Sequence, residues 1–192
     1  MEKNMHLRDA IDYVLHQGED GNEHAVLLRP DMDSGAEKLF TVILLKDGSK
    51  SNVDFTEESR VGNEVFQPGD LMVHNHPSCA SLSLSDIAFS WLVDVNIMAV
   101  AKTGSVFLAR ALKPLDEKSV DYVEAKIYRT MCKCVSSRLM TEADCQLIYN
   151  HCLNVGLQRA GFIAYNCQLS DVTIKAMENF KGALTKLIAD LR

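Results

Sequence analysis

The segment "LMVHNHPSCASLSLSDIAF", residues 71–89, constrains the fold more than any other part of the chain. Its first residues are apolar and match a short buried strand, which Pro77 brings to an end. Ser83 and Asp86 then have the Ser-x-x-Asp spacing of a capping box, so we expect a helix to begin there. A buried strand followed closely by a helix is typical of an α/β fold.

Up to about residue 113, the sequence alternates between helical and strand patterns. Apolar residues recur at helical spacing near the N-terminus, and short apolar runs bounded by turn residues indicate strands. The expected elements are a helix over 5–17, strands over 23–28, 38–45 and 71–74, a helix from Ser83 to Asp94, and a hairpin of "NIMAVAK" and "VFLARAL". Residues 51–70 carry no clear pattern.

The character of the sequence changes after Pro114. Residues 116–140, 141–160 and 170–191 carry helical periodicity with few turn signals. We therefore expect a first domain over residues 1–113, followed by a helical extension over 114–192. The apolar side chains of this extension are available to form a homodimer, to bind a partner or to cover a groove.

Composition excludes several classes of protein. The formal net charge is −6 and no block of Lys or Arg stands out, so the basic footprint of a nucleic-acid-binding protein is absent. No apolar run reaches the roughly 18 residues that a membrane-spanning helix needs, and the N-terminus lacks the pattern of a secretory signal. The 6 cysteines lie in apolar or helical context, which suits reduced thiols in the cytoplasm.

The two histidines of the opening segment are placed to bind a metal ion. Side chains alternate faces along a strand, so His74 and His76 point the same way while Asn75 points away. Two neutral imidazoles at this spacing can bind one zinc ion, and Asp86 could fold back from the next helix as a third ligand. Three protein ligands leave the fourth position of zinc for water, which is the arrangement of a catalytic site.

A purely structural interpretation explains part of the same segment. Ser83 and Asp86 serve equally well as the two partners of a helix capping box, without any metal. The adjacent His-x-His-Pro is left unexplained by that interpretation, and both remain open at the level of sequence.

The pattern "HNHPS…S-x-x-D" resembles the JAB/MPN (JAMM) zinc metalloproteases, most closely their RadC-like bacterial branch. The resemblance covers about residues 20–112 and implies a cytidine-deaminase-like fold, a mixed β-sheet flanked by helices. It also implies that His74, His76 and Asp86 bind zinc, and that Ser83 helps to hold the oxyanion.

The family motif includes a glutamate on an early strand, far upstream of the histidines. Glu23 fits that place, because it opens the strand "NEHAVLL" and lies 51 residues before His74. The resemblance implies that Glu23 acts as general base. His24 would point to the opposite face of the strand, away from the metal. Four other acids compete for the role of Glu23 in the sequence: Glu37, Glu57, Glu58 and Glu64.

The chain departs from the family pattern at two points. Nine residues separate His76 from Asp86, one fewer than is usual in the family, so Ser81 and Ser85 remain alternatives to Ser83. Cys79 stands where RadC-like members commonly carry glycine. Its thiol could pack in the loop, become oxidised or occupy the open position of the zinc ion.

These observations predict a zinc-dependent peptidase or isopeptidase. The resemblance implies a peptide or isopeptide amide as substrate, including one to a ubiquitin-like protein. Two alternatives come from other classes of protein: a non-catalytic scaffold on the same fold that binds a partner through the helical extension, and a RadC-like accessory factor in DNA transactions. The acidic charge weakens the second of these.

Overall fold

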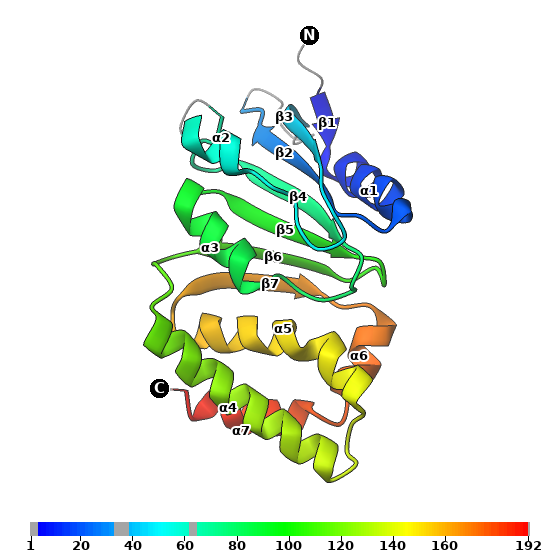
Figure 1. The fold of residues 1–192 in the computed structure, drawn as a ribbon, viewed down its shortest axis with the longest axis vertical. Helices are drawn as coiled ribbons and strands as arrows, with labels where there is room; N and C mark the ends of the chain where they lie inside the picture. Colours follow the sequence, from blue (N-terminus) through cyan, green and yellow to red (C-terminus); the bar gives the residue numbers. More distant parts are fainter. Residues whose placement is uncertain (1–3, 33–38, 62–64, 192) are drawn as a thin grey trace.

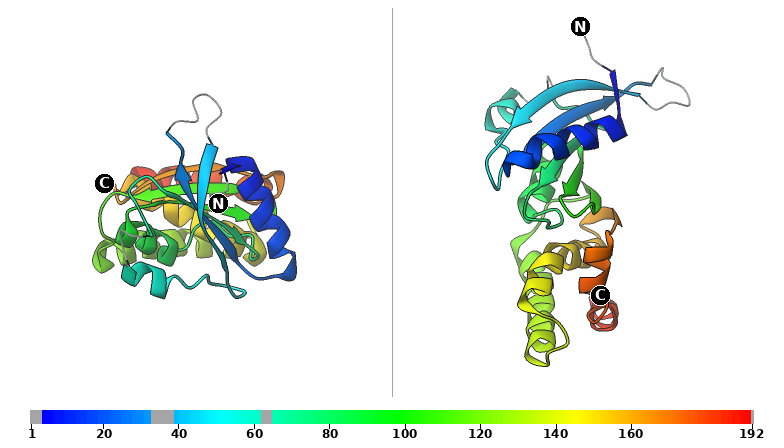
Figure 2. Two further views of the ribbon diagram at one scale, coloured as in Figure 1. Left: turned by 90° about the horizontal axis from the view of Figure 1, so that it is seen from above. Right: turned by 90° about the vertical axis from the view of Figure 1, so that its right-hand side faces the viewer.

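The computed structural model describes residues 4–32, 39–61 and 65–191, which form a seven-stranded mixed sheet flanked by helices (Figures 1 and 2). The order of strands across the sheet is β1-β3-β2-β4-β5-β6-β7. Strands β4 and β5 are parallel and every other neighbouring pair is antiparallel. The strands are β1 (Asn4–His6), β2 (His24–Pro30), β3 (Leu39–Asp47), β4 (Leu71–His76), β5 (Asn96–Ala101), β6 (Val106–Ala111) and β7 (Ile163–Gln168). The expected α/β class and mixed sheet are confirmed.

Three of the described helices begin at a residue whose side chain caps them. Ser83 and Thr141 each form a capping box with an aspartate three residues later, and the Asp116 side chain accepts the N–H of Ser119. The helices are α1 (Leu7–Gln17), α2 (Thr56–Val61), α3 (Leu84–Val93), α4 (Glu117–Ser136), α5 (Glu142–Arg159), α6 (Asp171–Met177) and α7 (Lys181–Ala189), with a 3-10 turn, η1, at Gly18–Asp20.

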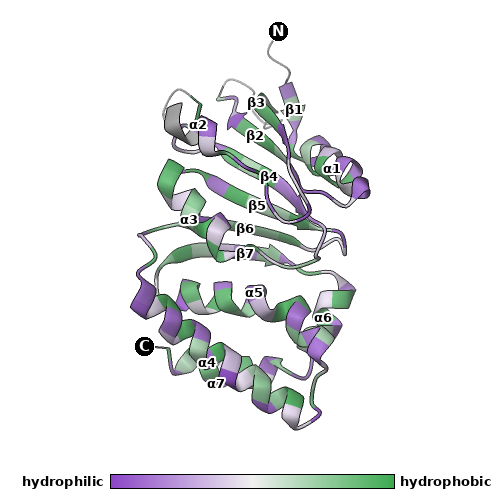
Figure 3. Cartoon of the chain, viewed as in Figure 1, coloured by the Kyte–Doolittle hydropathy of each residue, from purple (hydrophilic) through white to green (hydrophobic). Residues whose placement is uncertain are grey.

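The alternation of side chains along β4 divides the molecule into two cores. Leu71 and Val73 face α1 and pack with Ala10 and Val14 of that helix. Met72 belongs to a second and larger cluster on the opposite face, where α3 also packs. Because every residue of β4 is buried, neither face of this strand meets bulk solvent. Figure 3 shows that the central strands are largely apolar, with hydrophilic stretches that include the end of β4.

Three segments differ from the sequence-based expectation. The helix expected over 5–17 begins at Leu7, because Met5 and its neighbours pair with β3 as the edge strand β1. The helix expected over 170–191 is two helices, α6 and α7, separated by a turn that places Phe180 in the core.

Strand β7 is the third difference, since no strand was expected after residue 113. Residues 163–168 pair with β6 and form the last strand of the sheet. Ile163 and Tyr165 are buried while Ala164 and Asn166 are exposed, which is the alternation of a half-buried strand. The extension is therefore not wholly helical.

The larger core crosses the boundary expected at residue 113. It contains Phe107 and Ala109 of β6 together with Ile127 of α4, Ile148 of α5 and Phe180. Helix α5 lies alongside β7, with α4 and α7 beyond it (Figure 1). Among the described residues, no helix combines the length and apolar character needed to cross a membrane.

Candidate metal centre

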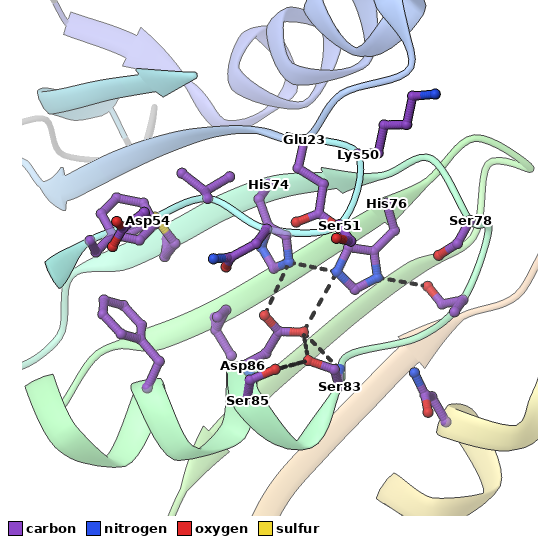
Figure 4. Close-up of a pocket in the computed structure, with 18 of the residues that line it drawn as sticks. Glu23, Lys50, Ser51, Asp54, His74, His76, Ser78, Ser83, Ser85 and Asp86 are labelled. Atoms are coloured by element: carbon purple, nitrogen blue, oxygen red, sulfur yellow. Dashed lines mark hydrogen bonds and ion pairs between the residues drawn. The ribbon is translucent and has the colours of Figure 1, made fainter. Parts of the chain in front are cut away.

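Three predicted ligands converge at the C-terminal end of β4. The Nε2 atoms of His74 and His76 are 2.8 Å apart, and the carboxylate of Asp86 lies 3.5 Å from the first and 3.6 Å from the second. Strand β4 supplies the two imidazoles and the first turn of α3 supplies the carboxylate (Figure 4). Among the described residues, these three form the group that could hold a metal ion.

The donor set and its spacing fit a zinc ion. Zinc binds imidazole nitrogen and carboxylate oxygen at about 2.0–2.2 Å, which places tetrahedral ligand atoms roughly 3.3 Å from one another. The observed separations of 2.8, 3.5 and 3.6 Å lie on both sides of that value. Three side chains would leave one of the four positions of a zinc ion without a protein ligand.

Both histidines present Nε2 to the site, and a hydrogen bond holds the ring of His76 in this orientation. The Nδ1–H of His76 donates to the carbonyl of Ala80 at 3.0 Å, so a neutral ring carries its lone pair on Nε2. Burial lowers the pKa of His74 to about 4, although Asp86 opposes this shift. A ring that stays neutral at physiological pH is the form that binds a metal.

The carboxylate of Asp86 belongs both to the capping box and to the candidate metal-binding group. Asp86 Oδ2 accepts the backbone N–H of Ser83 at 2.7 Å and its hydroxyl at 2.8 Å, while Ser83 Oγ accepts the N–H of Asp86. Burial alone would raise the pKa of Asp86, but the two histidines and Ser83 hold it below its ordinary value. The cap therefore fixes Asp86 as a carboxylate facing His74 and His76.

Glu23 lies beside the same group, on the side opposite Asp86 (Figure 4). It immediately precedes β2, and its backbone is held by the turn after β3: its N–H donates to Ser49 and its carbonyl accepts from Gly48. A Cβ on Gly48 would come within 2.8 Å of that carbonyl, so the turn requires glycine here. Burial raises the pKa of Glu23, and Asp86 adds to this shift while His76 opposes it.

Asn75 holds the backbone on both sides of Glu23. Its Oδ1 accepts the N–H of His24 at 2.6 Å, and its Nδ2 donates to the carbonyl of Asn22 at 2.9 Å. A Cβ on Gly18 would lie 2.2 Å from this amide, so η1 can pack this closely against Asn75 only with glycine at position 18. Asn75, between the two histidines, thus points away from the candidate metal-binding group, as expected, and holds the backbone around Glu23.

The three ligands and Glu23 line a cleft of about 430 Å³. One end is apolar, with Met72, Phe89 and Ile97, and the loop that carries Phe55 closes over it. Asn150 of α5 lines the cleft from the C-terminal part of the chain. This volume lies within the range of pockets that hold small ligands.

The three candidate serines differ in burial and in their contacts. Ser81 is fully buried and contacts Tyr165, so it cannot reach a substrate. Ser83 and Ser85 both line the cleft, with their Oγ atoms 2.8 Å apart. Of these two, Ser83 alone is hydrogen-bonded to Asp86.

Cys79 is not part of the ligand group. Its sulfur lies 3.7 Å from the carbonyl of Pro77, and it belongs neither to the metal-binding group nor to the cleft lining. Its φ of 61° is in the left-handed region, which glycine adopts without strain. This conformation explains why a loop of this shape favours glycine there.

His24 and one of the competing acids, Glu58, have other partners. The ring of His24 lies between Asp20 and Asp47, on the far side of the strand from the metal ligands, as expected. Glu58 forms an ion pair with Lys46. Two further candidates, Glu37 and Glu64, fall outside the described residues, and Glu57 is exposed in the first turn of α2.

Comparisons with family models, with curated proteins and with solved structures found no match for this chain. The function is therefore argued from the site itself.

Proposed function

We propose that the protein is a zinc-dependent amide hydrolase of the JAB/MPN (JAMM) type, acting on a peptide or isopeptide bond in the cytoplasm. One observation carries the proposal: two imidazole Nε2 atoms and a carboxylate converge in a cleft that also holds a buried glutamate of raised pKa. A structural zinc site is usually closed by four protein ligands, whereas three ligands in a cleft are typical of a catalytic one.

His74, His76 and Asp86 would hold the zinc ion, which when bound polarises a carbonyl and lowers the pKa of water towards 7. Glu23 is the proton carrier of the proposal. Its carboxylate takes the proton of the attacking water and returns it to the leaving amine, and a raised pKa suits a group that must do both.

Ser83 has two roles in this proposal. In the structure its hydroxyl donates to Asp86 Oδ2 and so holds that ligand. When the hydroxyl rotates towards the cleft it can donate to the oxyanion of the tetrahedral intermediate, the charge that must be stabilised for the barrier to fall.

Metal analysis of the purified chain, residues 1–192, tests the metal centre. We expect one zinc ion per chain, and its loss in His76→Ala with little change in the fold, because the ring packs at a cleft. His16→Ala is the matched control, since His16 is an exposed histidine on α1 and should not affect zinc content. A wild-type chain that binds no zinc after reconstitution would overturn the proposal.

Amide cleavage tests the activity. The zinc-loaded protein should hydrolyse members of a set of peptide and isopeptide substrates, including conjugates of ubiquitin-like proteins, and His76→Ala should hydrolyse none. Stoichiometric zinc without cleavage of any of them would reassign the site to a non-catalytic role.

A further inference from the structure

The loop between His76 and Asp86 is fastened to the C-terminal part of the chain by buried hydrogen bonds. Asn154 of α5 donates to Ser81 Oγ at 3.1 Å and to the carbonyl of Leu82 at 2.8 Å. The Ser81 hydroxyl lies 2.9 Å from the hydroxyl of Tyr165 on β7, and Asn150 donates to the Ser81 carbonyl at 3.2 Å. The partners in these contacts are separated by 69 to 84 positions in the sequence.

The direction of these hydrogen bonds follows from the donors available. Tyr165 also contacts Nδ1 of His151, at 2.9 Å. With Asn154 donating to Ser81 Oγ and a neutral His151 accepting at Nδ1, we assign the Ser81 proton to Tyr165 and the Tyr165 proton to His151. In this order every hydroxyl proton has an acceptor. Ser81, Asn154 and His151 are buried, so water does not compete for these hydrogen bonds.

The fastened loop reaches the metal ligands at both ends. On one side, Ala80 precedes Ser81 and its carbonyl accepts the Nδ1–H of His76, which fixes the ring with Nε2 towards the site. On the other side, Leu82 precedes Ser83, whose backbone N–H and hydroxyl hold Asp86. The orientation of two of the three ligands therefore depends on where residues 80–82 lie.

We infer that α5 and β7 position the metal centre: Asn154 and Tyr165 hold Ser81 and Leu82, and through them orient His76 and Asp86. The inference rests on the metal site of the proposed function and assigns a role to the C-terminal part of the chain. Asn154, Tyr165 and Ser81 are positioning residues, since none belongs to the ligand group.

Zinc affinity of the full-length protein, measured by competition with a chromophoric chelator, tests this inference. Ser81→Ala should weaken zinc binding about tenfold, within the 10- to 100-fold range typical of residues that orient metal ligands. The matched control is Ser90→Ala: Ser90 is equally buried, donates to Val95 and accepts from Ala111, but lies in the last turns of α3, away from the loop. Both variants lose a buried hydroxyl, so both should unfold more easily, and only the first should lose affinity.

Tyr165→Phe provides a second variant that keeps the ring packed and removes only the hydroxyl. It should also weaken zinc binding, and the visible spectrum of the cobalt-loaded protein should change in Ser81→Ala and Tyr165→Phe but not in Ser90→Ala. Unchanged zinc affinity in both Ser81→Ala and Tyr165→Phe would overturn the inference and leave the proposed function standing. A wild-type chain without zinc would overturn both.

Discussion

At the scale of single residues, the proposed chemistry depends most on the carboxylate of Glu23. We expect Glu23→Gln to keep one zinc ion per chain and to lose amide cleavage by about 10²–10⁴-fold, because an amide cannot accept the proton of water. Zinc content and turnover are measured on the same sample. Glu19→Gln, an exposed neighbour, is the control. Full activity in Glu23→Gln would transfer the role to another carboxylate.

Cys79 gives a second prediction at this scale, through its backbone. A residue other than glycine at a φ of 61° is strained by about 1 kcal/mol. Of two variants that both remove the thiol, Cys79→Gly should therefore have a free energy of unfolding about 1 kcal/mol higher than Cys79→Ala. Urea unfolding measures the difference. Equal stability of the two would show that the loop relaxes without cost.

At the scale of elements, Asn75 connects β4 to the start of β2. Asn75→Ala removes the partners of the His24 N–H and the Asn22 carbonyl, so we expect a loss of about 1–3 kcal/mol in the free energy of unfolding. The ligands stay in place, so zinc content should remain at one per chain, while turnover falls because Glu23 is no longer held.

Amide hydrogen exchange measures this effect directly, since the His24 N–H should exchange faster in Asn75→Ala. The control is Asn96→Ala, which removes an asparagine bonded to the backbone of Gly69 and Asp70 at the other end of the parallel strand pair. It should not affect His24. A His24 amide that exchanges as slowly in Asn75→Ala as in the wild type would contradict the positioning role.

Helix α5 carries a prediction on pH dependence. Burial lowers the pKa of His151 from 6.5 to about 4. Between these values the unfolded chain binds a proton that the folded chain does not, so the free energy of unfolding falls as the pH drops. From pH 7 to pH 5 this residue alone should account for a loss of about 2 kcal/mol.

His151→Gln isolates that contribution, because His74 shifts in the same direction and remains in both proteins. Urea unfolding of the metal-free proteins at the two pH values should show a smaller loss in the variant than in the wild type. Identical losses would mean that His151 does not titrate in this range.

At the scale of the whole molecule, the described core does not stop at residue 113. Residues 1–113 alone would expose the face of β6 that packs on the C-terminal helices and would leave the edge of β6 without β7. We expect this fragment to show no cooperative thermal unfolding and poor dispersion in its NMR spectrum, in contrast to the full chain. A cooperative transition would establish 1–113 as an independent domain.

Features of the molecule that depend on near neighbours follow from the amino-acid sequence alone. The period of two along a strand places His74 and His76 on one face, and the Ser-x-x-Asp spacing makes Ser83 and Asp86 a capping box, so local patterns suffice to name the three metal-ligand candidates. The hairpin of β5 and β6 is predictable for the same reason. Each of these signals acts within about a dozen residues.

Features that join distant segments depend on the tertiary structure. That Glu23 lies beside the candidate ligands depends on Asn75, whose side chain bonds to a residue 51 positions away. Ser81 is buried outside the cleft lining by a contact with Tyr165 across 84 positions. Strand β7 exists because an exposed edge of β6 is available to pair with a short alternating segment after Gly161. Such contacts depend on which surfaces become buried and on which hydrogen-bond partners the whole fold brings together. No local sequence pattern specifies them.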